Sequence, residues 1–135
     1  ATMNAQGAHT ALVSGGFTAF TSVIAERLGF AENRANILLT DGDKLSGTVA
    51  EPILGAEAKL AALREIASTL SLSPSDVMAV GDGANDLPMI LEAGTGVAIH
   101  AKPAVAAKAP FRIDHGDLTA LLFMQGYRAS EFHTR

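Results

Sequence analysis

The sequence contains no cysteine, which excludes disulfide frameworks and metal sites built on thiolates. It has no apolar run long enough to span a bilayer. The first ten residues do not combine a basic region with an apolar core, so we expect no signal peptide. Basic clusters are also missing and the net charge is -4, which disfavours nucleic acid as a partner. We therefore expect a cytoplasmic protein that binds neither nucleic acid nor a membrane.

What the sequence does contain is enough apolar residues for a folded core. Of its 135 residues, 48% are hydrophobic and 18% are charged, which is typical of one globular domain. Residues 1–13 have the pattern of the end of a helix, a stop at Gly7 and then a strand. We interpret a domain that opens in this way as the C-terminal part of something larger.

Apolar segments that suit strands alternate with segments that suit helices. We expect extended segments at residues 10–16, 35–52 (two pieces joined by a turn at 41–43), 77–80, 96–101 and 111–114. We expect helices at residues 17–30, 55–76, 84–94, 102–109 and 117–126. Gly29 ends the first, and Pro74 prevents continuation of the second, on which Leu60, Leu63, Ala67 and Leu70 face inward. This alternation predicts an α/β fold, a Rossmann-like parallel sheet with helices on both faces.

Two of these strands end in small and polar residues, at the sheet edge where ligands bind. One ends in Ser14-Gly15-Gly16, and the other in Gly81-Asp82-Gly83, followed by Asn85 and Asp86. Glycines let the backbone approach a ligand closely, and a carboxylate such as Asp82 suits Mg²⁺. A turn with a helix N-cap would explain a single Asp-Gly pair. It explains less well two acids, an amide and two glycines together.

Ser14 and Lys59 each have an ordinary interpretation beside a functional one. Ser14 could bind an anion together with the amides of the following helix, or it could be a simple N-cap. Lys59 lies one turn into its helix, where a lysine is usually solvated, whereas a buried lysine would bind phosphate. The four histidines show no ligand spacing, so we interpret them as structural or surface residues: His9, His100, His115 and His133.

Two familiar motifs are not matched. Residues 79–86, "AVGDGAND", follow a strand and open a helix as a dinucleotide fingerprint does. Asp86 replaces the third glycine, however, and its carboxylate would repel a pyrophosphate unless a cation intervened. The segment "VSGGF" around Ser14 is not G-x-S-x-G, which argues against a Ser-His-Asp hydrolase.

The pieces, taken in order, resemble the haloacid dehalogenase superfamily of phosphohydrolases and, within it, the phosphoserine phosphatase family. The superfamily pattern is a serine after a strand, then a lysine, then G-D-G-x-x-D after another strand. Ser14, Lys59 and residues 81–86 match it. Further stretches are similar to the phosphoserine phosphatase family: "VSGGFT", "AKPAV", "ANILLTDGDKLSGTV" and "DLTALLFMQGY". The resemblance implies Mg²⁺-dependent hydrolysis of O-phosphoserine, a small phosphate ester, through an aspartyl-phosphate in serine biosynthesis.

The resemblance also implies a role for each matching residue. Lys59 would be the catalytic phosphate clamp, and Asp82 would ligate Mg²⁺. Asp86 would orient Lys59 or a metal-bound water. The phosphate would be bound by Ser14, Gly15, Lys59 and Asn85.

The first motif of the superfamily, D-x-D-x-T, is not found in this sequence. Its two aspartates are the nucleophile and the general acid, which we therefore expect to lie outside this chain. Asp41-Gly42-Asp43 has the spacing but is followed by Lys44 and Leu45, and we interpret it as a turn. The helical cap expected before Ser14 is not found either. We interpret residues 1–135 as the C-terminal part of a phosphatase core domain, inactive alone, that pairs with an N-terminal half or a second copy.

In that fold the first strand lies between the strand that bears Ser14 and the strand that bears Asp82. Without it, both neighbours would have an unpaired edge. Two other interpretations stay open. One is a phosphatase of the same superfamily with another small phosphate ester as substrate, and the other is a non-catalytic short form that binds phosphate or Mg²⁺. A Rossmann-like domain without any ligand ranks last.

Overall fold

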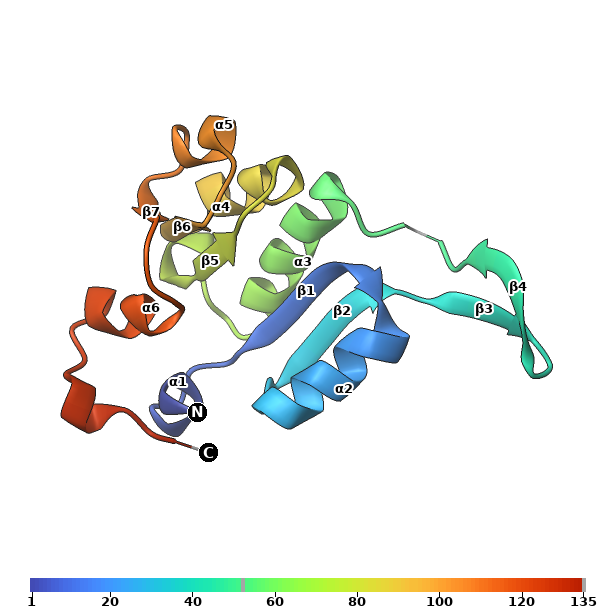
Figure 1. The fold of residues 1–135 in the computed structure, drawn as a ribbon, viewed down its shortest axis with the longest axis horizontal. Helices are drawn as coiled ribbons and strands as arrows, with labels where there is room; N and C mark the ends of the chain where they lie inside the picture. The colour runs from blue at the N-terminus through green and yellow to red at the C-terminus, as the bar shows by residue number, and fades with distance from the viewer. Residues whose placement is uncertain (52, 135) are drawn as a thin grey trace. The chain divides into compact units, whose positions relative to one another are not determined.

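The computed structural model describes residues 1–51 and 53–134, and the chain folds into two compact units (Figure 1). The first unit is built from the described residues of Ala1–Ile53 and Leu118–Arg135, and the second from Leu54–Asp117. Pro52, the last residue of the second extended piece expected at 35–52, lies outside the described residues. Each unit combines parallel strands with helices, so the predicted α/β class is confirmed.

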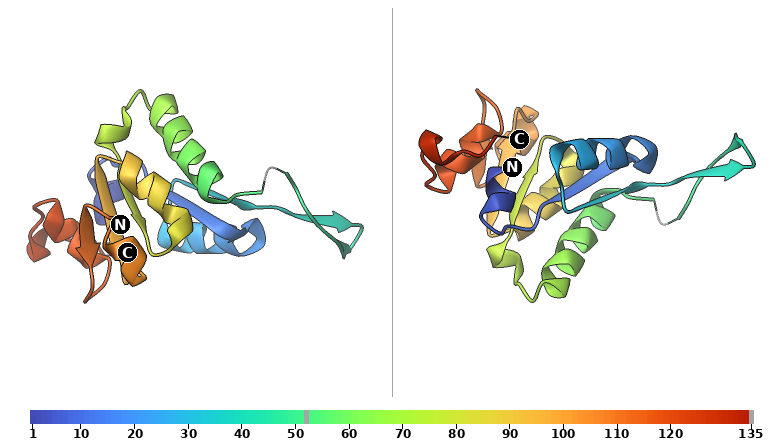
Figure 2. Two further views of the ribbon diagram at one scale, coloured as in Figure 1. Left: turned by 90° about the horizontal axis from the view of Figure 1, so that it is seen from above. Right: turned by 90° about the horizontal axis from the view of Figure 1, so that it is seen from below.

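The first unit contains one parallel pair of strands, β1 (Ala11–Phe17) and β2 (Glu32–Asn36). Helix α2 (Thr18–Leu28) connects the two strands and packs against both (Figure 2). It ends at Gly29, whose φ of 75° is left-handed and suits glycine. The predicted helix stop is therefore confirmed.

Only the last two residues of β2, 35 and 36, fall in a segment that the sequence predicted to be extended, because the strand includes no apolar run. Its extended conformation comes from pairing, since residues 32–34 lie opposite residues 11–13 of β1. The register then shifts between Val13 and Phe17, and Phe17 pairs with Asn36. The sequence placed 14–16 after the strand, whereas β1 continues through them with an irregular register.

An antiparallel hairpin follows β2. Its strands are β3 (Leu38–Asp41) and β4 (Lys44–Val49), joined by Gly42 and Asp43. Gly42 has a φ of 63°, which glycine adopts easily in a two-residue hairpin turn. The turn predicted at 41–43 is confirmed. The hairpin projects away from β1, β2 and α2 in all three ribbon views (Figures 1 and 2).

The first and last segments of the described chain meet within this unit. Helix α1 (Thr2–Ala5) opens the chain, while α6 (Thr119–Met124) and η3 (Ala129–Glu131) close it. The amide of His133 donates to the hydroxyl of Thr2 at 2.8 Å. The side-chain amide of Gln125 lies 3.7 Å from the sulfur of Met3. Thr2 is buried, so both ends of the chain contribute to one packed region.

The second unit is a three-stranded parallel sheet in the order β5-β6-β7. Its strands are β5 (Met78–Gly81), β6 (Thr95–Ile99) and β7 (Phe111–Ile113). The middle strand is the most buried, with Val97 fully enclosed. The helices of this unit are α3 (Ala56–Thr69), η1 (Pro74–Asp76), η2 (Ala84–Asp86), α4 (Leu87–Glu92) and α5 (Pro103–Ala106).

The core of the second unit lies between α3, α4 and β5. Its members are Leu63, Ala79, Met89 and Ala93, with Val77 partly buried against them. Helix α4 approaches β6 so closely that a Cβ at Gly96 would lie 1.8 Å from the carbonyl oxygen of Ile90. Only glycine fits there without displacing the helix.

The inward face predicted for α3 is partly right. Leu63 and Ala67 are buried, but Leu60 is only half-buried. The prediction was wrong for Leu70, which is 39% exposed. The helix ends at Thr69, and Ser71 turns the chain with a φ of 58°, so Leu70 lies beyond the packed turns.

Within the described residues, β1 pairs only with β2, and β5 pairs only with β6. The strand that contains Ser14 and the strand that precedes Asp82 therefore each have an unpaired edge, as predicted. Leu12 and Val13 of β1 are only half-buried, although apolar runs of this kind usually lie in central strands. No helix formed by the described residues has the length and apolar character needed to cross a membrane.

Candidate functional site

A buried ion pair lies at the centre of the candidate site in the second unit. The Nζ atom of Lys59 donates to Oδ1 of Asp86 at 2.6 Å. Both residues are only 6% exposed. From its residue type and position in a helix, Lys59 would be expected to be solvated, but α3 directs its side chain into the protein. Two unlike charges of this kind are buried only when they are paired and hydrogen-bonded.

Asp86 connects α3 to the loop that follows β5. Its second oxygen, Oδ2, accepts hydrogen bonds from the amides of Asp82 and Gly83, each at 3.1 Å. Burial by itself would raise the pKa of Asp86. The hydrogen bonds from Lys59 and from the two amides, with the charge of Lys59, outweigh burial, so the pKa lies below its usual value. Asp86 is therefore held as a carboxylate.

The glycine at the end of β5 makes room for this carboxylate. A Cβ at Gly81 would lie 2.4 Å from the Cβ of Asp86 and 2.6 Å from its Oδ2. Any larger residue would push Asp86 away from Lys59. Gly81 is therefore the residue whose small size allows the ion pair, and its place in the G-D-G-x-x-D pattern has a steric reason.

Asp82 presents a different kind of carboxylate. Its side chain is exposed, and within residues 1–51 and 53–134 it has no hydrogen-bond or ion-pair partner. Its backbone is held on both sides, by Asp86 at the amide and by a long contact of 3.4 Å from the amide of Lys102 to the carbonyl oxygen. Asn85, in the same loop, is also exposed.

A single free carboxylate fits Mg²⁺ as one ligand, because this cation takes oxygen ligands and keeps several waters. Among the described residues, no group of three histidine, aspartate or glutamate side chains could hold a metal ion. Asp82 would therefore be one protein ligand of a site that this part of the chain does not complete.

Ser14 lies in the first unit, within β1. Its hydroxyl oxygen accepts a hydrogen bond from the amide of Gly16 at 3.0 Å. The carbonyl of Gly15 accepts one from the side chain of Asn36 at 2.9 Å. Asn36 is buried and fixes the irregular stretch of β1, a role that sequence reasoning missed. A buried asparagine in a strand without an apolar run gave no signal that could have revealed it.

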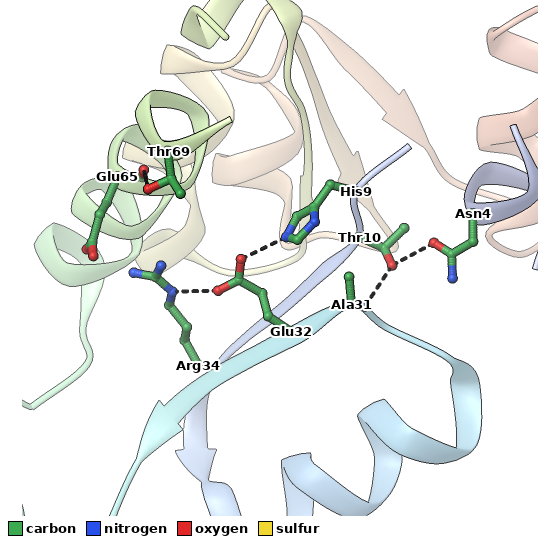
Figure 3. Close-up of polar contacts among 8 residues, drawn as sticks. All are labelled: Asn4, His9, Thr10, Ala31, Glu32, Arg34, Glu65 and Thr69. Carbon is green, nitrogen blue, oxygen red and sulfur yellow. Dashed lines mark hydrogen bonds and ion pairs between the residues drawn. The ribbon is translucent and has the colours of Figure 1, made fainter. Parts of the chain in front are cut away.

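The polar contacts around His9 support β1 and β2 rather than a ligand site. The ring of His9 lies 2.8 Å from Glu32, which also accepts from Arg34 at 3.0 Å (Figure 3). Burial would raise the pKa of Glu32, but the hydrogen bonds from His9 and Arg34 lower it overall. Nearby, Thr10 donates to Asn4. These contacts join the segment before β1 to β2 and α1.

Two further histidines, His100 and His115, differ in whether their rings make a hydrogen bond to a described residue. His100 lies just after β6, and its ring contacts the carbonyl oxygen of Gly116 at 2.7 Å. His115 is exposed, and the described residues give its side chain no hydrogen-bond partner. His100 was interpreted from the sequence as a structural or surface residue, and its contact shows that it links two loops.

The sequence model of the family of haloacid dehalogenase-like hydrolases matches residues 1–91 of this chain. The chain belongs to this family. This haloacid dehalogenase-like chain is similar to the phosphoserine phosphatase of Albidiferax ferrireducens, with 43% identity over 126 residues that make up 90% of this chain and 53% of the relative. It is also similar to the phosphoserine phosphatase of Saccharomyces cerevisiae, with 36% identity over 93% of this chain and 41% of the relative.

A solved haloacid dehalogenase-like structure is similar as well. It is a phospho-aspartyl intermediate analogue of phosphoserine phosphatase, with a TM-score of 0.82 and 38% identity over 90% of this chain and 58% of that chain. The family resemblance predicted from the sequence is therefore confirmed. The chain spans about half the length of the curated relatives it matches.

Proposed function

We propose that the whole protein that carries this chain hydrolyses O-phosphoserine to serine and phosphate, as a step of serine biosynthesis. This chain would supply the groups that bind the phosphate and neutralise its charge. The observation that carries the proposal is the buried Lys59–Asp86 pair held against the loop after β5. The relatives named as phosphoserine phosphatases support the choice of substrate. The structure named as a phospho-aspartyl intermediate analogue supports a route through an aspartyl-phosphate.

Lys59 would act as the phosphate clamp. An ammonium group has three N–H donors, and within the described residues only one of them has a partner, Asp86. The other two are available for phosphoryl oxygens. Because Lys59 is buried, little water screens its ammonium group. The positive charge of Lys59 would therefore act more strongly on a bound phosphate. Asp86 would hold the Nζ atom of Lys59 in a fixed orientation.

Asp82 would hold Mg²⁺ through its free carboxylate. When bound, Mg²⁺ would neutralise charge on the phosphoryl oxygens. Phosphoryl transfer depends mainly on positioning and charge stabilisation, and these are the tasks that Asp82, Lys59 and Asp86 would share. The nucleophile and the general acid are expected outside residues 1–135.

Ser14, Gly15 and Asn85 would complete the phosphate contacts. The Ser14 oxygen accepts from the Gly16 amide, which leaves its own O–H hydrogen available, because a hydroxyl both accepts and donates. Ser14 could therefore donate to a phosphoryl oxygen without breaking the local structure of β1. The amide of Gly15 and the side chain of Asn85 would bind further phosphate oxygens.

The deciding measurement is Mg²⁺-dependent release of phosphate from O-phosphoserine by the whole protein and by the 135-residue chain alone. We expect release by the whole protein and none by the chain alone. In the whole protein, Asp82→Asn should raise the Mg²⁺ concentration for half-maximal rate by at least about tenfold. Even residues that only orient a metal ligand cost that much when replaced.

The matched control is Glu51→Gln, which removes an exposed carboxylate from the segment after β4 and should leave the Mg²⁺ dependence unchanged. An unchanged dependence in Asp82→Asn would show that Asp82 is not a metal ligand. Release by the chain alone, abolished by Lys59→Ala, would show that the chain holds a nucleophile of its own, with Asp41 or Asp43 as the candidates. Faster release from another small phosphate ester would change the substrate but keep the site.

A further inference from the structure

His100 is held in an unusual backbone conformation at the end of β6. Its φ is 44°, and among the described residues other than glycine only Ser71 shares a positive value. Histidine is one of the few residues that adopt this region with some frequency. Because His100 is exposed, burial of its ring does not explain why the chain turns there.

The contacts of His100 join two loops of the second unit. Its backbone amide donates to the carbonyl of Ile113, the last residue of β7, at 2.8 Å. Its Nε2 lies 2.7 Å from the carbonyl oxygen of Gly116. A carbonyl only accepts, so Nε2 carries the hydrogen. His100 therefore fixes the segment after β6 to the segment after β7 at two points.

The segment that His100 fixes is the one that contacts Asp82. Two residues further on, the amide of Lys102 points to the carbonyl oxygen of Asp82 at 3.4 Å. A hydrogen bond of this length is weak, so it restrains Asp82 only if the segment that donates it is held by other contacts. The Asp82 loop is anchored on the α3 side by Lys59 and Asp86 and on the β6 side by this contact.

We infer that His100 is a positioning residue, whose ring hydrogen bond to Gly116 holds the 100–102 segment so that Lys102 supports the Asp82 loop. The inference rests on the proposed function, because it assigns to Asp82 the role of metal ligand. His100 does not touch the metal or the substrate. It acts through the backbone of Lys102 on the orientation of the Asp82 carboxylate.

Two substitutions separate the ring contact from the backbone turn. Glutamine carries an N–H donor as many bonds from Cα as Nε2 of histidine, whereas the donor of asparagine is one bond shorter. Asparagine, on the other hand, tolerates the left-handed backbone better. If the hydrogen bond to Gly116 matters, His100→Gln should be the milder change. If only the turn matters, His100→Asn should be milder.

The experiment measures two quantities in the whole protein. The first is the Mg²⁺ concentration for half-maximal release of phosphate from O-phosphoserine, and the second is the hydrogen exchange rate of the Lys102 amide by NMR. We expect His100→Asn to raise the half-maximal Mg²⁺ concentration by about tenfold, the low end for residues that orient a metal ligand. It should also speed hydrogen exchange at the Lys102 amide. His100→Gln should stay close to wild type in both. The control His115→Asn, on the neighbouring loop, should change neither.

The outcomes separate this inference from the function on which it rests. If the wild-type protein releases no phosphate from O-phosphoserine, the proposed function fails, and the exchange rates of Lys102 still decide whether His100 holds the loop. If His100→Asn lowers only the melting temperature, with Mg²⁺ dependence and exchange unchanged, His100 is merely structural. A milder effect of asparagine than of glutamine would also overturn the inference.

Discussion

At the scale of single residues, the site depends on two acids with opposite surroundings. Asp86 is buried and has three hydrogen-bond donors around its carboxylate, whereas Asp82 is exposed and lacks a side-chain partner among the described residues. The first is locked in place, and the second is free to bind a cation. The two acids are linked through the backbone, because the amide of Asp82 is one of the donors that hold the carboxylate of Asp86.

Replacing Lys59 should destabilise the protein in a way that depends on pH. Lys59→Met leaves the Asp86 carboxylate buried without its cation, which should lower the free energy of unfolding by about 3–5 kcal/mol at pH 7. The folded-state pKa of Asp86 lies below its unfolded value of about 4. Its stabilising contribution is thus complete above that value and is lost as the pH falls through the folded pKa.

The difference between wild type and Lys59→Met should therefore shrink as the pH falls below about 4, since protonated Asp86 no longer needs a cation. Urea unfolding at a series of pH values measures it. Lys108→Met is the control, because Lys108 is exposed and has no side-chain partner in the described residues. A loss of stability that is equal at all pH values would contradict the role of the ion pair.

At the scale of elements, the close contact between α4 and β6 should be intolerant of side chains. Gly96→Ala places a Cβ where it would lie 1.8 Å from the carbonyl oxygen of Ile90, so the helix must shift. We expect a loss of about 1–3 kcal/mol in the free energy of unfolding, measured by chemical denaturation. Gly55→Ala is the matched control in the same unit, because its Cβ would meet nothing within 4 Å. It should cost less than Gly96→Ala, and the remaining loss would reflect the N-cap position of Gly55 before α3, where glycine is preferred to alanine.

Most elements could be predicted from the sequence because their apolar residues recur at the spacing that places them on one face, where they pack against neighbouring elements. Strands β5 and β6 and helix α3 are apolar on the face that packs, although α3 ends at Thr69, before the end of the predicted segment 55–76. Residues 32–34 of β2 could not be predicted, because their conformation comes from pairing with β1 rather than from their own side chains. The same limit applies to Leu70, whose exposure depends on where α3 ends.

The candidate site was predicted in part, for a similar reason. The motif residues Lys59, Asp82 and Asp86 could be named from their order along the chain, and the structure brings them together around the loop after β5. What the sequence could not give is burial, since Lys59 on residue type alone would be solvated. The contribution of His100 and Asn36 was also hidden, because each acts through a backbone carbonyl that no side-chain pattern reveals.

At the scale of the whole molecule, the unpaired edges of β1 and β5 are the main liability. Each strand has a hydrogen-bonded neighbour on one side only within the described residues, and exposed strand edges promote association with other chains. We expect the 135-residue chain alone to self-associate or to melt without a single cooperative transition. Analytical ultracentrifugation and calorimetry test this. A monodisperse monomer with equal calorimetric and van't Hoff enthalpies would show that the edges are satisfied in another way.

The contact between Thr2 and His133 sets an order of events during synthesis. The first unit uses residues from both ends of the chain, whereas the second is continuous from Leu54 to Asp117. A ribosome adds about 5–20 residues per second, so helix α1 waits on the order of ten seconds for the segment that contacts Thr2. The second unit is fully translated during that interval. Within residues 1–135, the packing around Thr2 is therefore completed only after the last segment has been made.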